Sequence, residues 1–405
     1  MMSKVGCAHS GDGGLHGIHE LTVERLEPEM SDHRQQQFVD SVLDVRFAFG
    51  GRIGKLLEHY LTLDSQNWQL SWQFKTYYAV RTLIPLSLRQ FLQQHRNQAI
   101  VPRRDWYLDR AFLDELNSAR AADLSCDPNR CMIDLWPDGC AHAVAITHDI
   151  ESKYGLSRVW QLAELEEKLG LRSAWYFVAN RYDIDPGMIS ELKSRGHEVG
   201  VHGLKHDGRL FSSRQTFDKR CKAINKTVAD WGADGFRSPM MHRNLVWMQQ
   251  LQCAYDSSCF DIDPFQAMPG GVRGVWPMIV GNLVELPCTL PQDHTLFVTL
   301  GMKNIDVWTK KYQLIRQLRG LAMTIIHPDY MDTPARLEHY GRFLEHVVAA
   351  EDAWHTLPRE ISRWWRDRDS SSIVGNCIHG PAAHRGCSTR LASLFNDINV
   401  LPDGN

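Results

Sequence analysis

The chain has 405 residues, a length that suits two or three domains or one large domain with extensions. Hydrophobic residues make up 43% and charged residues 23%, which excludes a wholly disordered chain because so many apolar side chains can build a full core. The 45 Lys and Arg residues against 48 Asp and Glu residues leave a net charge of −3, which excludes a strongly basic nucleic-acid-binding protein.

Residues 1–33 are expected to be a disordered leader, because their first part is rich in Gly, His and Ser and has no apolar core of a secretory signal. No stretch of the chain approaches the ~18 consecutive apolar residues of a membrane helix. The 10 cysteines include no C-x-x-C pair, which argues against a zinc site built from cysteines. We therefore expect a cytoplasmic protein with free thiols.

Residues 34–135 are expected to form a helical region. Apolar residues recur there with a helical period over 38–47 and again over 72–92.

Residues 136–350 alternate short apolar runs with helical segments, which predicts an α/β domain. Right-handed βα units of this kind build a parallel sheet or a barrel. The expected strands cover residues 143–146, 173–178 and 198–201, and the expected helices cover 159–169, 186–194 and 337–348. In the last part, 351–405, we expect a helix over 359–368 and then a flexible tail.

Two carboxylates follow the first expected strand. Asp149 and Glu151 lie two positions apart, so the alternation of a strand places both on one face. Such a pair at the C-terminal end of a strand suits one metal ligand and one general base. A polar turn would show the same pattern, so the pair alone fits both interpretations equally.

Two histidines follow the third expected strand. His202 and His206 are four residues apart, which brings both imidazoles to one face of a helical turn, and imidazole binds zinc and similar metals. The chain has 19 histidines, so this spacing alone more often means two surface residues.

Three more polar groups, Arg237, Asp256 and His327, follow later apolar runs. Each alone is more simply a surface ion pair, a turn residue or the end of a strand. The order of all the groups is more specific, because it resembles the polysaccharide deacetylase family, the NodB-homology or carbohydrate esterase 4-like hydrolases. The motifs that carry the resemblance are Thr147-His148-Asp149-Ile150, Gly196-His197-Glu198-Val199-Gly200-Val201-His202 with His206, Arg237-Ser238-Pro239, and Thr324-Ile325-Ile326-His327.

The resemblance covers about residues 140 to 330. It implies a distorted (β/α) barrel of the NodB-homology type over residues 136–350, with the site at the C-terminal ends of the strands. It also implies one divalent metal ion held by Glu151, His202 and His206. Zinc is the default ion for these nitrogen and oxygen ligands, with cobalt, nickel, manganese and iron as alternatives.

The resemblance assigns roles to the remaining polar groups as well. Asp149 would be the general base and His327 the general acid, and Arg237 would orient Asp149. Asp256 would hold the protonated form of His327, with Asp261 and Asp263 as rivals for that role.

The chain departs from the family pattern at three positions. Ile150 stands where the family has its metal-binding Asp, so the metal role passes to Glu151 on the same strand face as Asp149. Met240 replaces the aromatic residue after the Arg-x-Pro motif, and Thr324 replaces the Leu of the last motif. We therefore expect a different groove wall and a different acetyl-methyl pocket.

The implied function is removal of an N-acyl group, in the first instance N-acetyl, from a sugar or glycoconjugate by metal-bound water, an Asp base and a His acid. A non-catalytic relative that binds carbohydrate or a lipid carrier is one alternative, and a hydrolase of another linear amide is a second. The third is a non-haem iron oxygenase, which uses two His and one carboxylate but usually on antiparallel β-folds.

Residues 66–104 contain no Asp or Glu and six cationic side chains among aromatic ones. This pattern predicts a surface for an anionic carrier of the substrate, such as a lipid phosphate or nucleotide diphosphate, or for peripheral membrane contact. The alternative is a solvated basic face whose aromatic residues dock helices on the barrel. The cationic residues are Lys75, Arg81, Arg89, Arg96, Arg103 and Arg104.

Overall fold

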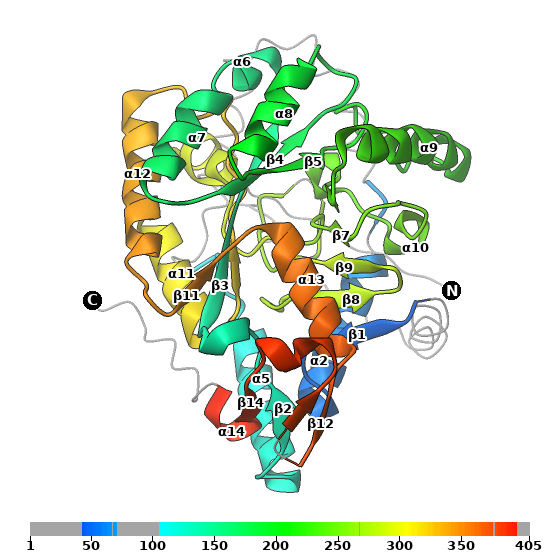
Figure 1. Cartoon of the computed structure of the whole chain (residues 1–405), viewed down its shortest axis with the longest axis vertical. Helices are drawn as coiled ribbons and strands as arrows, with labels where there is room; N and C mark the ends of the chain where they lie inside the picture. Colours follow the sequence, from blue (N-terminus) through cyan, green and yellow to red (C-terminus); the bar gives the residue numbers. More distant parts are fainter. Residues whose placement is uncertain (1–42, 67, 71–104, 267, 376, 395–405) are drawn as a thin grey trace, which may run out of the picture.

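The computed structural model describes residues 43–66, 68–70, 105–266, 268–375 and 377–394. Its centre is a parallel sheet with helices packed around it (Figure 1). The parallel strands, in spatial order, are β9 (Leu283–Glu285), β7 (Tyr255–Asp256), β6 (Gly235–Phe236), β5 (Glu198–Val201), β4 (Ser173–Phe177), β3 (His142–Ile150) and β10 (Leu321–Met323).

The two ends of this sheet meet through the chain that follows β9. The amide of Leu290 donates to the carbonyl of Met323 in β10 at 3.1 Å, and the amide of Cys288 donates to the carbonyl of Cys259 at 2.9 Å. The extended chain after β9 therefore bridges the β7 side and the β10 side. The result is the distorted (β/α) barrel that was predicted, and the strand ends gather at one rim.

The strands read as nearly continuous apolar runs because both of their faces are covered. All nine residues of β3 are buried. The helices around the barrel are α7 (Val159–Lys168), α8 (Pro186–Ser194), α9 (Arg214–Trp231), α11 (Asp306–Gln317) and α12 (Pro334–Val348). The strands and helices expected over 143–201 and the helix expected over 337–348 match this arrangement, with shifts of a few residues at their ends.

The N-terminal region differs from the helical prediction at its start. Residues Val45–Phe47 form β1, which pairs antiparallel with β8 (Met278–Val280), and α2 (Gly51–Gln66) begins only after it. Within 38–47, the apolar residues of the described part also alternate with the period of a strand. Pairing with β8 therefore makes this segment a strand and not a helix. Helix α5 (Arg110–Cys126) and strand β2 (Cys131–Ile133) follow, whereas the helical pattern over 72–92 lies outside the described residues.

The C-terminal part contains the expected helix as α13 (Pro358–Asp369), preceded by β11 (Ala353–His355). The flexible tail expected after it differs from the structure over 372–394, where short strands form. Strand β12 (Ser372–Val374) pairs with β13 (Cys377–His379), and β14 (Ser388–Arg390) pairs with β2. The polar composition of this segment gave no local sign of strands, and the partner of β14 is supplied by a distant part of the chain.

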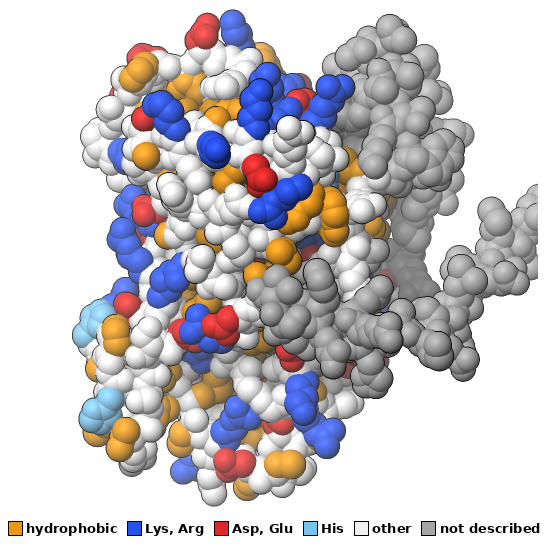
Figure 2. All heavy atoms as spheres, turned by 90° about the vertical axis from the view of Figure 1, so that its right-hand side faces the viewer, with side chains coloured by type: hydrophobic (Ala, Val, Ile, Leu, Met, Phe, Trp, Pro, Cys, Tyr) orange, Lys and Arg blue, Asp and Glu red, His pale blue; other side chains and the backbone are white. Residues whose placement is uncertain are grey.

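Short elements complete the described chain: α6 (Lys153–Leu156), α10 (Leu245–Met248), α14 (Leu391–Leu394), the 3-10 turns Pro137–Gly139, Pro239–Met241 and Pro381–His384, and a π-helix, His294–Thr299. Among the described residues, none of the helices has the length and apolar character needed to cross a bilayer. On the face drawn in Figure 2, acidic, basic and hydrophobic side chains are interspersed over the described surface.

Candidate metal centre and its neighbours

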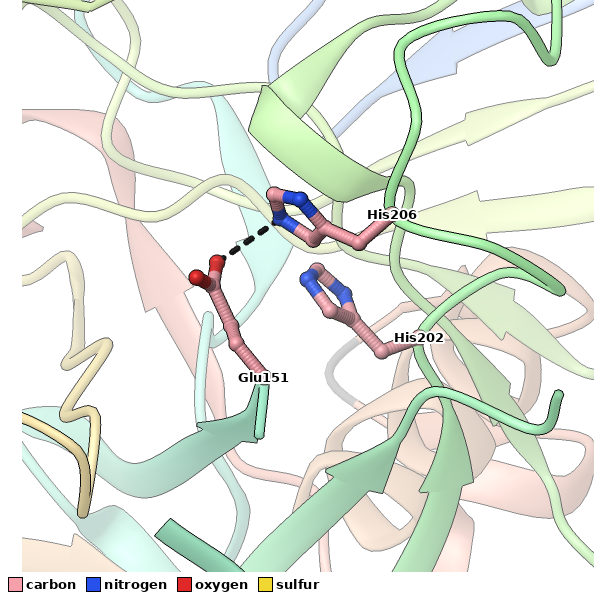
Figure 3. A group of neighbouring side chains, drawn as sticks. All are labelled: Glu151, His202 and His206. Atoms are coloured by element: carbon pink, nitrogen blue, oxygen red, sulfur yellow. Dashed lines mark ion pairs between the residues drawn. The ribbon is translucent and has the colours of Figure 1, made fainter. Parts of the chain in front are cut away.

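Glu151, His202 and His206 point toward one another at the rim of the barrel (Figure 3). Glu151 directly follows β3, His202 directly follows β5, and His206 lies in the loop after it. One ligand atom from each residue lies within 4.8 Å of the others, and Glu151 Oε1 is 2.8 Å from His206 Nε2. The spacing of these three side chains therefore suits a single divalent ion.

A hydrogen bond from Nδ1 of His202 fixes the tautomer that leaves Nε2 able to bind a metal ion. This Nδ1 lies 3.1 Å from the carbonyl oxygen of Arg237, which can only accept, so Nδ1 carries the proton. The lone pair is then on Nε2, which is buried and has no hydrogen-bond partner among the described residues. Burial lowers the pKa of His202 to about 4, so the imidazole is neutral at pH 7. A buried acceptor aimed into a carboxylate–histidine cluster fits a metal ion.

Asp149 lies beside this trio with its charge held by Arg237. Nη1 of Arg237 donates to Asp149 Oδ1 at 2.8 Å, and both side chains are buried. Burial alone would raise the pKa of Asp149, but Arg237 and the nearby histidines lower it below its ordinary value. Asp149 Oδ2 is 3.8 Å from His202 Nε2, so a carboxylate that remains ionised lies next to the proposed metal position.

His327 completes the group from the chain after β10, the parallel neighbour of β3. Its Nε2 is 3.7 Å from Glu151 Oε1, and its Nδ1 is 2.6 Å from Asp293 Oδ1. Burial would lower the pKa of His327, but Asp293 together with the nearby carboxylates raises it to about 10. The imidazole is therefore protonated at neutral pH and can give a proton.

The structure corrects the partner expected for His327, which is Asp293 rather than Asp256. Asp293 also accepts from the backbone amide of His327 at 2.8 Å. Asp256 instead accepts from the hydroxyl of Ser258 at 2.7 Å, and Ser258 Oγ accepts from the amide of Ser238 at 2.9 Å. Asp256 thus supports the turn that follows Arg237.

Neither rival for that role contacts His327. Asp261 forms a buried ion pair with Lys311, and Asp263 accepts from the hydroxyl of Thr295 at 3.1 Å. Asp293 was missed because it follows the irregular chain after β9, where no apolar run marks a strand end. In the sequence, Asp293 stands out only as an acidic residue next to His294.

The Arg-Ser-Pro turn packs against the loop that carries the histidines. Gly203 has φ +64°, and a Cβ there would lie 2.7 Å from Cδ of Pro239. Only glycine combines this backbone conformation with so close an approach. Met240, at the position of the family's aromatic residue, also has a positive φ of 61°. Thr324 is buried, and its Oγ1 accepts from the amide of Thr147 at 3.1 Å, so it ties two strand ends together.

A second residue missed from the sequence is Asp329, two positions after His327. Its carboxylate accepts from the amide of Glu151 at 3.3 Å and from the hydroxyl of Ser152. The turn that carries Glu151 is therefore fixed to the strand end that carries His327.

One family model matches part of the chain. Residues 138–244 match the family model described as polysaccharide deacetylase, which confirms the resemblance over that part of the chain. No curated protein matches the chain.

Three solved structures are similar at low identity. A candidate polysaccharide deacetylase from Mycobacterium smegmatis is 21% identical over 59% of this chain and 94% of that one, with a TM-score of 0.49. The Puue allantoinase is 17% identical over 57% and 92% of the two chains, with a TM-score of 0.47. A further candidate deacetylase, from Pseudomonas aeruginosa PAO1, is 17% identical over 57% and 93%, with a TM-score of 0.45.

Proposed function

We propose that the protein is a metal-dependent hydrolase that removes an N-acyl group, in the first instance N-acetyl, from a sugar or glycoconjugate. The match of residues 138–244 to the polysaccharide deacetylase family model supports this proposal. The observation that carries the proposal is the arrangement of Glu151, His202 and His206 within 4.8 Å, beside an ionised aspartate and a protonated histidine. Metal-dependent amide hydrolysis uses a metal site, a base and an acid, and these residues could provide all three.

The metal would be held by these three residues, and zinc is the first choice for such ligands. Such an ion supplies Lewis acidity, which polarises an amide carbonyl and makes water acidic enough to lose a proton near neutral pH.

The residues of the chain divide the proton transfers between them. Asp149 remains ionised beside Arg237 and accepts the proton of the attacking water. His327, charged through its contact with Asp293, gives a proton to the leaving amine, which could not depart as an amide anion. Arg237 fixes the orientation of Asp149, and its carbonyl fixes that of His202.

The test measures metal content and acetate release together on the full chain. Wild type loaded with Zn²⁺ or Co²⁺ is expected to bind one ion per chain and to release acetate from N-acetylglucosamine or its short oligomers. His202→Ala is expected to lose both, whereas His379→Ala, which removes an exposed histidine from β13, keeps both. Metal binding without release from any N-acyl sugar would point to a binding protein or to another amide, and equal metal content in all three proteins would exclude this site.

The carrier of the sugar stays a prediction from the sequence. The basic stretch expected to bind a lipid phosphate or a nucleotide diphosphate spans 66–104, and residues 71–104 lie outside the described part of the chain. The cytoplasmic location is likewise a proposal that follows from the sequence alone.

A further inference from the structure

Four buried residues form a column inside the barrel that starts beside Asp149: Arg237, Tyr176, Tyr255 and Glu198. Tyr176 in β4 is the register partner of Asp149 in β3, and the face of its ring lies 4.4 Å from Cζ of Arg237. The hydroxyl of Tyr176 is 2.7 Å from that of Tyr255 in β7, and Tyr255 donates to Glu198 at the start of β5. The column therefore runs from one end of the barrel to the guanidinium that holds the proposed base.

The barrel wall is shaped to admit these rings. Gly200 in β5 is the register partner of Tyr176, and a Cβ there would overlap the ring of Tyr176. A Cβ at Gly235 in β6 would overlap the ring of Tyr255 in the same way. A parallel strand normally fills such positions with branched side chains, so the two glycines mark places where aromatic rings lie across the neighbouring strand.

While Glu198 is ionised, it fixes the direction of the hydrogen bonds, because a carboxylate can only accept. Glu198 Oε1 accepts from Tyr255, and its Oε2 accepts from the amide of Arg359 at 3.0 Å. The single proton of Tyr255 is thereby used, so Tyr176 donates to Tyr255. A phenol that donates becomes more electron-rich, which strengthens the attraction between its ring face and a cation.

We propose that Tyr176 is a positioning residue for Arg237 and that Tyr255 and Glu198 hold Tyr176 in place. Arg237 has hydrogen-bond partners on its edge, namely Asp149, Thr147 and Ser257, and the ring of Tyr176 supports the face of its guanidinium. Without that support, the guanidinium can tilt out of the plane that serves Asp149. The inference rests on the proposed function for its kinetic test, but its structural test does not.

The kinetic test compares two substitutions of Tyr176. Tyr176→Leu removes the ring and is expected to lower kcat about ten- to thirty-fold with KM changed less than about two-fold, because a desolvated cation–π contact is lost away from the substrate. Tyr176→Phe keeps the ring and is expected to lose no more than about three-fold. On an Arg237→Lys background, Tyr176→Leu should add less than about two-fold, because contacts that act through one group are not additive.

Tyr312→Phe is the matched control. Tyr312 is also fully buried, and its hydroxyl lies 2.7 Å from His142, at the end of β3 opposite to Asp149, so this variant should keep wild-type kcat. Equal kcat for Tyr176→Leu and Tyr176→Phe, or full additivity with Arg237→Lys, would overturn the inference.

If Tyr176→Leu does not fold, Tyr255→Phe tests the same column without leaving a cavity. It leaves the buried hydroxyl of Tyr176 without its acceptor, which displaces the ring, whereas Tyr176→Phe removes that hydroxyl altogether. Tyr255→Phe should therefore lower kcat several-fold and show the same lack of additivity with Arg237→Lys, and wild-type kcat in this variant would count against the column.

A crystal structure of each folded variant separates this inference from the proposed function. The distance from Arg237 Nη1 to Asp149 Oδ1 should stay near 2.8 Å in Tyr176→Phe and should exceed hydrogen-bond range in Tyr176→Leu or, failing that, lengthen in Tyr255→Phe. An unchanged distance in all variants would refute the positioning role. If wild type releases no acyl group from any sugar, the proposed function fails while this distance still decides the inference.

Discussion

Asp149 and Glu151 carry the same functional group two residues apart, and their neighbours give them different chemistry. Asp149 is held by a guanidinium, whereas Glu151 faces two imidazoles, with His206 Nε2 at 2.8 Å and His327 Nε2 at 3.7 Å. Burial would raise the pKa of Glu151, but the histidines lower it well below its ordinary value. A carboxylate among imidazoles suits a ligand, and one beside Arg237 suits a base.

Substitution of these two carboxylates should separate metal binding from turnover. Asp149→Asn keeps an acceptor for Arg237 and should bind metal normally while kcat falls by ~10²- to 10⁴-fold, as expected for the loss of a general base. Glu151→Ala should lose the metal itself. Elemental analysis and acetate release on both variants test this. Full metal content in Glu151→Ala would show that Glu151 does not replace the metal-binding Asp that the family has at the position of Ile150.

His327 and Asp293 should act as one unit. His327→Ala should reduce hydrolysis of an N-acetyl amide far more than hydrolysis of an activated aryl ester, because only the amine leaving group needs a proton. Asp293→Asn removes the charge that keeps the pKa of His327 high, so it should show the same selective loss in a milder form. Rates for both substrates with both variants test the assignment. A loss of equal size on amide and ester would indicate that His327 only maintains the structure.

At the scale of elements, local sequence patterns located the parts of the barrel that depend on local periodicity. The continuous apolar runs of β3, β4 and β5 and the amphipathic α7, α8 and α12 each carry their own signal. The strand ends then bring Asp149, Glu151, His202 and His206 to one rim, so the order of the motifs predicted a cluster of side chains that could hold a metal ion.

The features that the sequence did not reveal are those set by distant partners. Strand β1 forms because β8 offers an edge, and β14 forms because β2 does, although neither segment has a strong strand pattern of its own. Asp293 reaches His327 only because the chain after β9 closes the barrel against β10. No local spacing encodes that closure, which is why Asp256 was the natural but incorrect choice.

At the scale of the whole molecule, buried ion pairs join the N-terminal region to the barrel. Asp64 near the end of α2 pairs with Arg243 after the Arg-Ser-Pro turn, and it also accepts from the amide of Gly271 at 2.6 Å. Lys311 of α11 pairs with Asp261 and donates to the carbonyl of Tyr107 at 2.7 Å. Charged pairs of this kind add little net stability but disfavour other arrangements of the same segments, so α2 has one defined position against the barrel.

The stability of the whole fold should depend on pH through Glu198. Burial raises the pKa of Glu198 from its ordinary 4.5 to about 7, although Tyr255 and the amide of Arg359 donate to it. The folded state therefore binds a proton more tightly than the unfolded state. The stabilisation is complete below pH 4.5 and is lost as the pH rises through about 7, since above that value both states are ionised and the folded state has a buried charge. A difference of this size is worth about 3 kcal/mol, because each factor of ten in a protonation equilibrium corresponds to ~1.4 kcal/mol.

Glu198→Gln removes the titration while it keeps the shape of the side chain. Urea unfolding at pH 5 and pH 8 should show that wild type loses about 2 to 3 kcal/mol more than Glu198→Gln between these two values, because only the wild-type side chain must ionise inside the barrel. Glu345→Gln, a change of the same charge at an exposed position on α12, should follow wild type at both values. If Glu198→Gln follows the same pH dependence as wild type, the carboxylate is already ionised in the folded protein at low pH. The column beneath Arg237 would then end in a charge that its neighbours fully compensate.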